Sequence, residues 1–173
     1  MKLKTFIVVL LMLLAGCGYQ FGGQGIELPG KISRLKIDLF ANQTSEPYLE
    51  SYITASTTLR LMRQHDVQLV ETTEDAEAVL SGEVLQYQLS AAAYDAVDDI
   101  QSYRITMKIQ ARMTRLEDGK ILWQDALIRY EDFVSNGSSI TDQEDLETAA
   151  QKSLSIRLAE DLAWQMSSGF GSE

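Results

Sequence analysis

Cys17 carries the only thiol of this 173-residue chain, and its neighbours predict the chemistry of that thiol. It follows the sequence Leu14-Ala15-Gly16, and small residues before a cut site suit the groove of a signal peptidase. The pattern is typical of a bacterial lipobox, in which a diacylglycerol is attached to the thiol and the chain is cut between Gly16 and Cys17. A buried core cysteine is the alternative, but it does not account for these flanks.

The segment before Cys17 supports the same interpretation. A basic start (MKLK) is followed by an apolar run over residues 6–15, which is much shorter than the roughly 20 residues needed to span a bilayer. We therefore expect residues 1–16 to be removed as a signal peptide. The remaining 157 residues would hold 13 basic and 25 acidic side chains, a net charge of about −12. Such a charge argues against nucleic acid as a partner.

The other reactive side chains predict neither catalysis nor a metal site. His65 is the single histidine, and the sequence gives no reason to place a nucleophile and an orienting group beside it. Asp95, Asp98 and Asp99 lack the spacing of a calcium loop and read as a solvated loop. We expect no cofactor and no enzymatic activity.

A stripe of basic residues is the more informative pattern. Arg104, Lys108 and Arg112 lie four residues apart, so in a strand they share one face at intervals of roughly 13 Å. Arg129 on the following strand is expected to join them. Such a stripe can bind phosphate groups through charge-assisted hydrogen bonds. The alternative is that these charges only keep a sheet face soluble and discourage edge pairing.

The elements that must position these residues begin after a glycine-rich tether over residues 17–30. We expect a strand over 34–40 and a helix to about residue 64, with Ser45 as N-cap and Pro47 in the first turn. Its apolar stripe would comprise Leu49, Tyr52, Ile53, Ser56, Leu59 and Arg63. Residues 67–70 form either a short strand or an extended connection.

Three further strands and a second helix complete the prediction. A strand over 78–89 is expected to carry a bulge, because its alternation changes phase near Gly82 to Leu85. Residues 103–114 alternate strictly between apolar and polar, and Asp118-Gly119 predicts a hairpin turn into a strand over 121–133. A last helix should run to about Ser168 from a capping box formed by Thr141 and Glu144. The apolar residues expected to line it are Leu146, Ala150, Leu154, Leu158, Leu162 and Met166.

The order β-α-β-β-β-α predicts an α+β two-layer sandwich, in which two helices cover one face of a mostly antiparallel four-stranded sheet. The expected organisation is a signal peptide (1–16), a lipidated tether (17–30), one domain (31–168) and a short tail (169–173).

Several fragments, taken in order, resemble one family, the lipopolysaccharide-assembly lipoproteins (LptE) of Gram-negative outer membranes. The fragments are CGYQF at 17–21, LP at 28–29, FANQT at 40–44 with Glu46, DAEAVLSG at 75–82, YD at 94–95, YR at 103–104 and GKILW at 119–123. Each is weak alone, but their order and spacing span most of the mature chain.

The resemblance implies a two-helix α+β domain and a partner, the large outer-membrane β-barrel that inserts lipopolysaccharide into the outer leaflet. The lipoprotein would plug that barrel, support its assembly and bind lipopolysaccharide. Gly18 after the lipidated Cys17 fits sorting to the outer membrane, where the lipid would hold the domain at the inner leaflet, facing the periplasm and the barrel lumen.

This chain departs from the family in the regions proposed to contact lipopolysaccharide. Residues 93–99 and 139–142 carry no Lys or Arg. The candidate contacts with lipopolysaccharide or the barrel are therefore Arg104, Lys108, Arg112 and Arg129. The alternative function is a free-standing lipid carrier on the periplasmic side, which would need an apolar cavity between sheet and helices.

Overall fold

The computed structural model describes residues 28–64, 66–135 and 139–168. The sites predicted at Cys17 and His65, the signal peptide, most of the tether and the tail lie outside these residues. The elements in chain order are η1 (Pro29–Lys31), β1 (Arg34–Ile37), β2 (Ala41–Asn42), α2 (Leu49–Met62), β3 (Gln68–Leu69), β4 (Ala78–Tyr94), β5 (Ile100–Arg115), β6 (Ile121–Val134) and α3 (Ile140–Ser168).

The sheet has six strands in the order β3-β1-β4-β5-β6, with β2 pairing with β4 beside β1. The long strands β4, β5 and β6 are antiparallel neighbours, whereas β1, β2 and β3 join by parallel pairing. The α+β class with two helices is confirmed, but the prediction of four mostly antiparallel strands is wrong. The difference arises because α2 separates β1 from β3 and β4, and a helical crossover returns the chain in a parallel direction.

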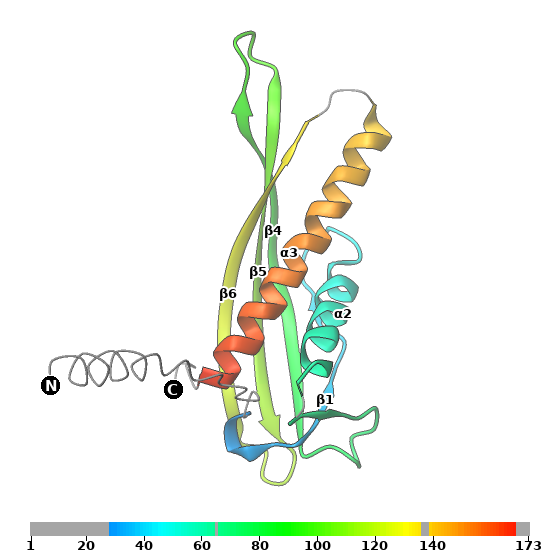
Figure 1. Ribbon diagram of the computed structural model, residues 1–173, viewed down its shortest axis with the longest axis vertical. Coiled ribbons are helices and arrows are strands. Elements are labelled where there is room, and N and C mark those ends of the chain that lie inside the picture. The colour runs from blue at the N-terminus through cyan, green and yellow to red at the C-terminus, as the bar shows by residue number, and fades with distance from the viewer. Residues whose placement is uncertain (1–27, 65, 136–138, 169–173) are drawn as a thin grey trace, which may run out of the picture.

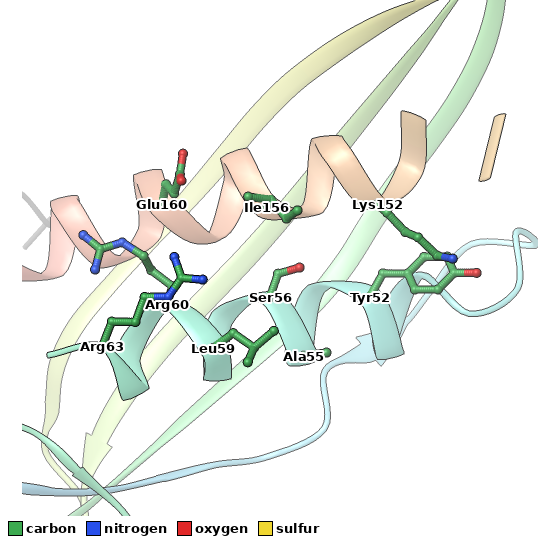
Figure 2. A pocket seen from close by; sticks show the side chains of 9 residues that line it. All are labelled: Tyr52, Ala55, Ser56, Leu59, Arg60, Arg63, Lys152, Ile156 and Glu160. Carbon is green, nitrogen blue, oxygen red and sulfur yellow. The ribbon is translucent and has the colours of Figure 1, made fainter. Parts of the chain in front are cut away.

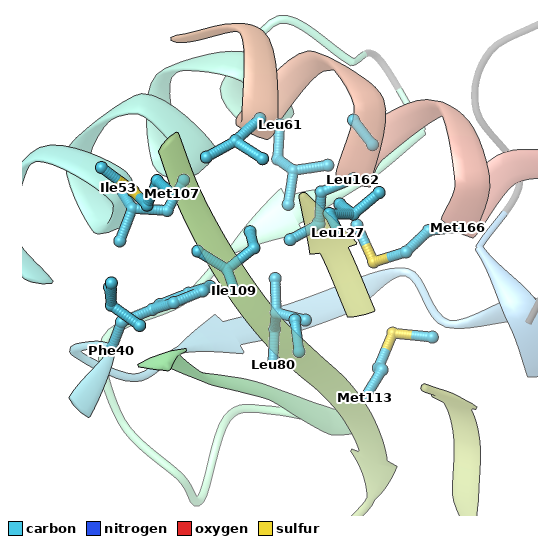
Figure 3. Packing of buried hydrophobic residues seen from close by; sticks show 14 of the residues in the cluster. Phe40, Ile53, Leu61, Leu80, Met107, Ile109, Met113, Leu127, Leu162 and Met166 are labelled. Carbon is cyan, nitrogen blue, oxygen red and sulfur yellow. The ribbon is translucent and has the colours of Figure 1, made fainter. Parts of the chain in front are cut away.

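Both helices cover the same face of the sheet, and the β4–β5 hairpin extends past them (Figure 1). The period-two pattern of β5 explains this layering, because its apolar set points toward the helices and is fully or almost fully buried. These buried residues are Ile105, Met107, Ile109, Ala111 and Met113. They meet buried side chains of α2 and α3, such as Ile53, Leu61 and Leu162, in one continuous core (Figure 3).

The first predicted strand is interrupted. β1 ends at Ile37, Leu39 is exposed, and Phe40 is buried instead. A Cβ atom on Gly82 would lie only 2.2 Å from the Phe40 ring, so the ring packs directly on the glycine backbone of β4. The period of two therefore gives way to a bend that turns Phe40 into the core. The bulge predicted nearby is confirmed as a register shift between Val84 and Gln86.

The helix α2 begins later than predicted. Its N-cap position is Tyr48, in the left-handed region, and Leu49 is the first helical residue, so Ser45 as N-cap is wrong. The Asn42 side chain organises the preceding turn by accepting from the Thr44 N–H at 3.0 Å and donating to the Glu46 carbonyl at 2.7 Å.

The buried face of α2 comprises Leu49, Ile53, Thr57 and Leu61. The predicted stripe mixed this face with a second one, because Leu59 is exposed and Tyr52 and Ser56 are only half-buried. A helix packed against both a sheet and a second helix has two contacting faces, which a single stripe does not distinguish.

The long helix α3 ends at Ser168 as predicted, but its start differs. The Asp142 N–H donates to the Ser139 hydroxyl at 3.1 Å, which makes Ser139 the capping side chain and leaves Thr141 inside the first turn. The apolar residues predicted to line α3 are confirmed, since Ala150, Leu154 and the corresponding residues of later turns are buried.

Candidate interaction surface

The face of the sheet opposite the helices is defined by the pairing of the long strands. Residues directly opposite one another in an antiparallel pair share a face, so the register identifies every member. We call this surface the open face. It comprises Ser81, Glu83, Gln86, Gln88 and Ser90 of β4, Arg104, Thr106, Lys108, Gln110 and Arg112 of β5, and Gln124, Ala126, Ile128, Tyr130 and Asp132 of β6.

The register places Arg104, Lys108 and Arg112 together on the open face, as the spacing predicted. Arg104 donates two hydrogen bonds to Asp132, from Nε at 2.7 Å and from Nη2 at 2.8 Å. Its guanidinium carbon lies 4.2 Å from the centre of the Tyr130 ring. The hydrogen bonds from Arg104 hold the pKa of the Asp132 carboxyl below its ordinary value. The Arg104 side chain is therefore already bound by Asp132 and Tyr130 of the neighbouring strand.

The other two cations of the stripe make fewer contacts. Arg112 donates from Nε to the Ser81 hydroxyl at 3.3 Å, and Lys108 lies between Gln86 and Ile128 on the neighbouring strands. Within the described part of the chain, neither forms an ion pair. Their free N–H donors can bind a carboxylate or phosphate of a partner.

The open face differs in charge from the rest of the chain. It carries three basic and two acidic side chains, whereas the whole chain has a net charge of −10. It also presents two large side chains to solvent, with Ile128 53% exposed and Tyr130 56% exposed. A polar, slightly cationic surface with a few apolar anchors suits a protein interface better than a lipid interior.

Arg129 does not join the stripe, so the expectation that it would is wrong. It lies opposite Met107, on the helix-covered face, and its Nε is 2.7 Å from Asp161 of α3. Its Nη1 also donates to the Ile128 carbonyl at 2.9 Å. The composition of β6 alone could not set its register against β5, and a shift of one residue moves every side chain to the other face.

The sequence did not predict a polar cluster that lies between α3 and the sheet. The Tyr87 hydroxyl of β4 bonds to Glu147 of α3 at 2.5 Å and to Gln151 at 3.1 Å, and Gln151 reaches Glu46 at 2.8 Å. Burial and then the bond to Glu147 raise the pKa of Tyr87 above its ordinary value. These partners are distant in the sequence, so no local pattern could have revealed the cluster, which joins α3 to the sheet.

The predicted aspartate loop is a structural turn. The Asp95 carboxylate accepts the N–H groups of Val97 at 2.8 Å and Asp99 at 2.9 Å, and these bonds lower the pKa of Asp95. Among the residues the structure describes, no group of His, Cys, Asp and Glu side chains could hold a metal ion. In the same residues, no helix is long and apolar enough to cross a membrane.

Fold and surface together define a two-layer α+β domain that buries one face of a long sheet under two helices and leaves the other polar. The chain belongs to the family described as LptE, Lipopolysaccharide-assembly, whose model matches residues 32–166. This confirms the resemblance drawn from the sequence fragments. It gives the chain a role in lipopolysaccharide assembly among outer-membrane lipoproteins that are not enzymes.

Solved structures share the fold at low sequence identity. Rare lipoprotein B from Shewanella oneidensis is 13% identical, with a TM-score of 0.54 over 79% of this chain and 96% of its own. Lipoprotein B from Nitrosomonas europaea is 14% identical, with a TM-score of 0.55 over 88% and 92%. A lipoprotein from Caulobacter crescentus is 8% identical, with a TM-score of 0.54 over 75% and 89%. A search of curated proteins gives no match.

Proposed function

We propose that this chain is the outer-membrane lipoprotein that assembles with, and plugs, the β-barrel through which lipopolysaccharide reaches the outer leaflet. The observation that carries the proposal is the open face. The interior of large outer-membrane barrels is polar, so a sheet with one polar face can contact that interior without exposing its own core. Family members associate with barrels of this kind, which supports the choice of partner.

The length of the sheet is consistent with this role. β4 has 17 residues, which at a rise of about 3.3 Å per residue gives a strand of roughly 55 Å. The apolar band of an outer-membrane barrel is only about 25 Å tall. A domain inserted along its long axis would therefore contact the lumen over the full height of this band. The β4–β5 hairpin, which extends past the helices (Figure 1), would reach beyond it.

A lipid on Cys17, with Gly18 behind it favouring sorting to the outer membrane, would anchor the domain at the inner leaflet, on the periplasmic side of the barrel. Direct contact with lipopolysaccharide belongs to the same proposal. Arg104, Lys108 and Arg112 are the candidate contacts on the open face, and Lys108 and Arg112 have donors free for phosphate. Arg129 remains a candidate only through the other face, where it is held by Asp161.

Co-purification from native membranes tests the association. The tagged, lipidated protein should bring down a large outer-membrane barrel, and the proposal fails if it brings down none. In the variant with Arg104, Lys108 and Arg112 all changed to Ser, we expect weaker lipopolysaccharide binding that depends less on salt. The variant with Lys31, Lys120 and Arg157 all changed to Ser removes three cations outside the open face and is the charge-matched control. Unchanged binding in the triple variant would limit the stripe to solubility or barrel docking.

The lipid-carrier alternative needs an apolar cavity between the sheet and the helices. That space is occupied by side chains with no solvent exposure, among them Ile53, Met107 and Leu158. This packing counts against a carrier that encloses its lipid between the sheet and the helices.

A further inference from the structure

An apolar groove of about 340 Å³ lies between α2 and α3, on the side of the helix layer that faces away from the sheet core (Figure 2). Leu59 and Ile156 form its middle and are 58% and 52% exposed. The lining residues are Tyr52, Ala55, Ser56, Leu59, Arg60, Arg63, Lys152, Ile156 and Glu160. None of the contacts described above accounts for this exposed apolar surface.

The ends of the groove are cationic. Arg60 and Arg63 lie at one end, and Lys152 lies at the other, 5.4 Å from the centre of the Tyr52 ring (Figure 2). Within the described residues, none of these three cations forms an ion pair, and Glu160 is the single acid in the lining. Three unpaired cations in one groove of a chain with net charge −10 indicate an anionic ligand.

The combination of an apolar middle and cationic ends selects an amphiphile. The groove runs roughly 16 Å along α2, from Tyr52 to Arg63. Its volume of about 340 Å³ is at the small end for ligand sites, which suits one alkyl chain rather than a lipid with many chains.

We propose that the groove between α2 and α3 binds an anionic phospholipid, with one acyl chain along Leu59 and Ile156 and the phosphate at Arg60 and Arg63. Basic residues beside exposed apolar helix surface are the pattern by which helices bind anionic membrane surfaces. The site lies on a different layer from the open face. It is therefore independent of the proposed association with a barrel, and either proposal can fail alone.

Native mass spectrometry of the full lipidated protein in a non-ionic detergent tests the site. Phosphatidylglycerol and phosphatidylcholine with identical acyl chains are titrated in parallel, without a barrel present. We expect one phosphatidylglycerol to bind per chain in a saturable manner, at least about tenfold more tightly than phosphatidylcholine. Removing two cations near an anionic lipid, in Arg60→Ser with Arg63→Ser, should weaken binding about 30-fold.

The control variant carries Lys31→Ser and Lys120→Ser, which change the net charge equally but lie outside both the groove and the open face. It should bind phosphatidylglycerol as the unchanged protein does. Ile156→Asp, which places a carboxylate on the apolar floor, should weaken binding at least about tenfold. Thermal unfolding shows whether each variant is folded. If a groove variant does not fold, Lys152→Ser takes its place, and we expect it to weaken phosphatidylglycerol binding about fivefold.

Three results would overturn the proposal. Phosphatidylcholine could bind as tightly as phosphatidylglycerol, or the control variant could lose as much binding as the groove variant. The third result is a competition experiment in which an acidic amphipathic peptide displaces bound phosphatidylglycerol at a lower concentration than added phosphatidylglycerol needs. That result would assign the groove to a protein partner. In each case the co-purification of a barrel would still test the function proposed above.

Discussion

The two faces of the long sheet follow opposite physical rules. On the helix-covered face, side chains such as Met107 and Ile109 have no solvent exposure and meet α2 and α3. On the open face, Arg104 and Arg112 are held by a few hydrogen bonds to side chains of adjacent strands. Neighbouring residues of the same strand therefore serve stability on one side and remain available for contact on the other.

This difference between the two faces separates the residues that maintain the core from those that can contact a partner. Changes on the covered face alter packing throughout the core, because protein interiors are closely packed. The open face can change its charges without altering the fold. A surface that meets a partner can thus change in sequence while the covered face preserves the architecture.

The largest expected difference is between Met107 and Lys108, which are consecutive but face opposite sides. Met107→Ala should lower the free energy of unfolding by about 2–5 kcal/mol, because it leaves a cavity in the core. Lys108→Ala should change it by less than about 0.5 kcal/mol. Urea denaturation of both variants measures this difference. Similar losses in the two would show that the open face is not free of structural constraint.

Gly82 tests how closely the covered face is packed. In Gly82→Ala, the added methyl group would overlap the Phe40 ring, and we expect a loss of about 1–3 kcal/mol in unfolding free energy. Ser81→Ala, the adjacent change on the open face, is the control. Combining Gly82→Ala with Phe40→Leu should recover part of the loss relative to the sum of the single changes. Strict additivity in this cycle would contradict the direct contact.

Tyr87 tests the polar cluster that ties α3 to β4. Tyr87→Phe removes the hydroxyl that contacts Glu147 and Gln151 and should cost about 1–2 kcal/mol. Since the pKa of Tyr87 is raised in the folded protein, its contribution is present below the ordinary tyrosine pKa of about 10 and is lost as pH rises above it. Unfolding free energy measured from pH 8 to 11 should therefore fall more steeply in the unchanged protein than in Tyr87→Phe. Parallel pH profiles would exclude this role.

The smallest effect is expected for the ion pair on the open face. Arg104→Ser should lower stability only slightly, because both side chains of the pair are partly exposed and solvent screens their attraction. The lowered pKa of Asp132 means that the contribution of the pair is present above the ordinary aspartate pKa of about 3.9 and is lost as pH falls. Nuclear magnetic resonance titration of Asp132 should show its pKa rising in Arg104→Ser. An unchanged pKa would contradict the pairing.

The sequence predicted the elements whose pattern is local. The alternation along β5, the turn at Gly119 and the apolar positions of α3 each depend on residues close together in the chain. Strand pairing did not follow from such patterns. Nothing local indicated that Arg129 faces Asp161, or that a bend at Leu39 turns Phe40 onto Gly82.

The amino-acid sequence by itself determined the α+β class, the covered face of β5 and the likeness to the family, and it predicts the lipobox at Cys17. These features follow from composition and from periods of two or 3.6 residues, which local backbone geometry sets. The tertiary structure alone decided the parallel strands, the side on which Arg129 lies, the Tyr87 cluster and the groove between α2 and α3. Each of these joins segments far apart in the chain, and only the packing of the whole core decides which segments meet.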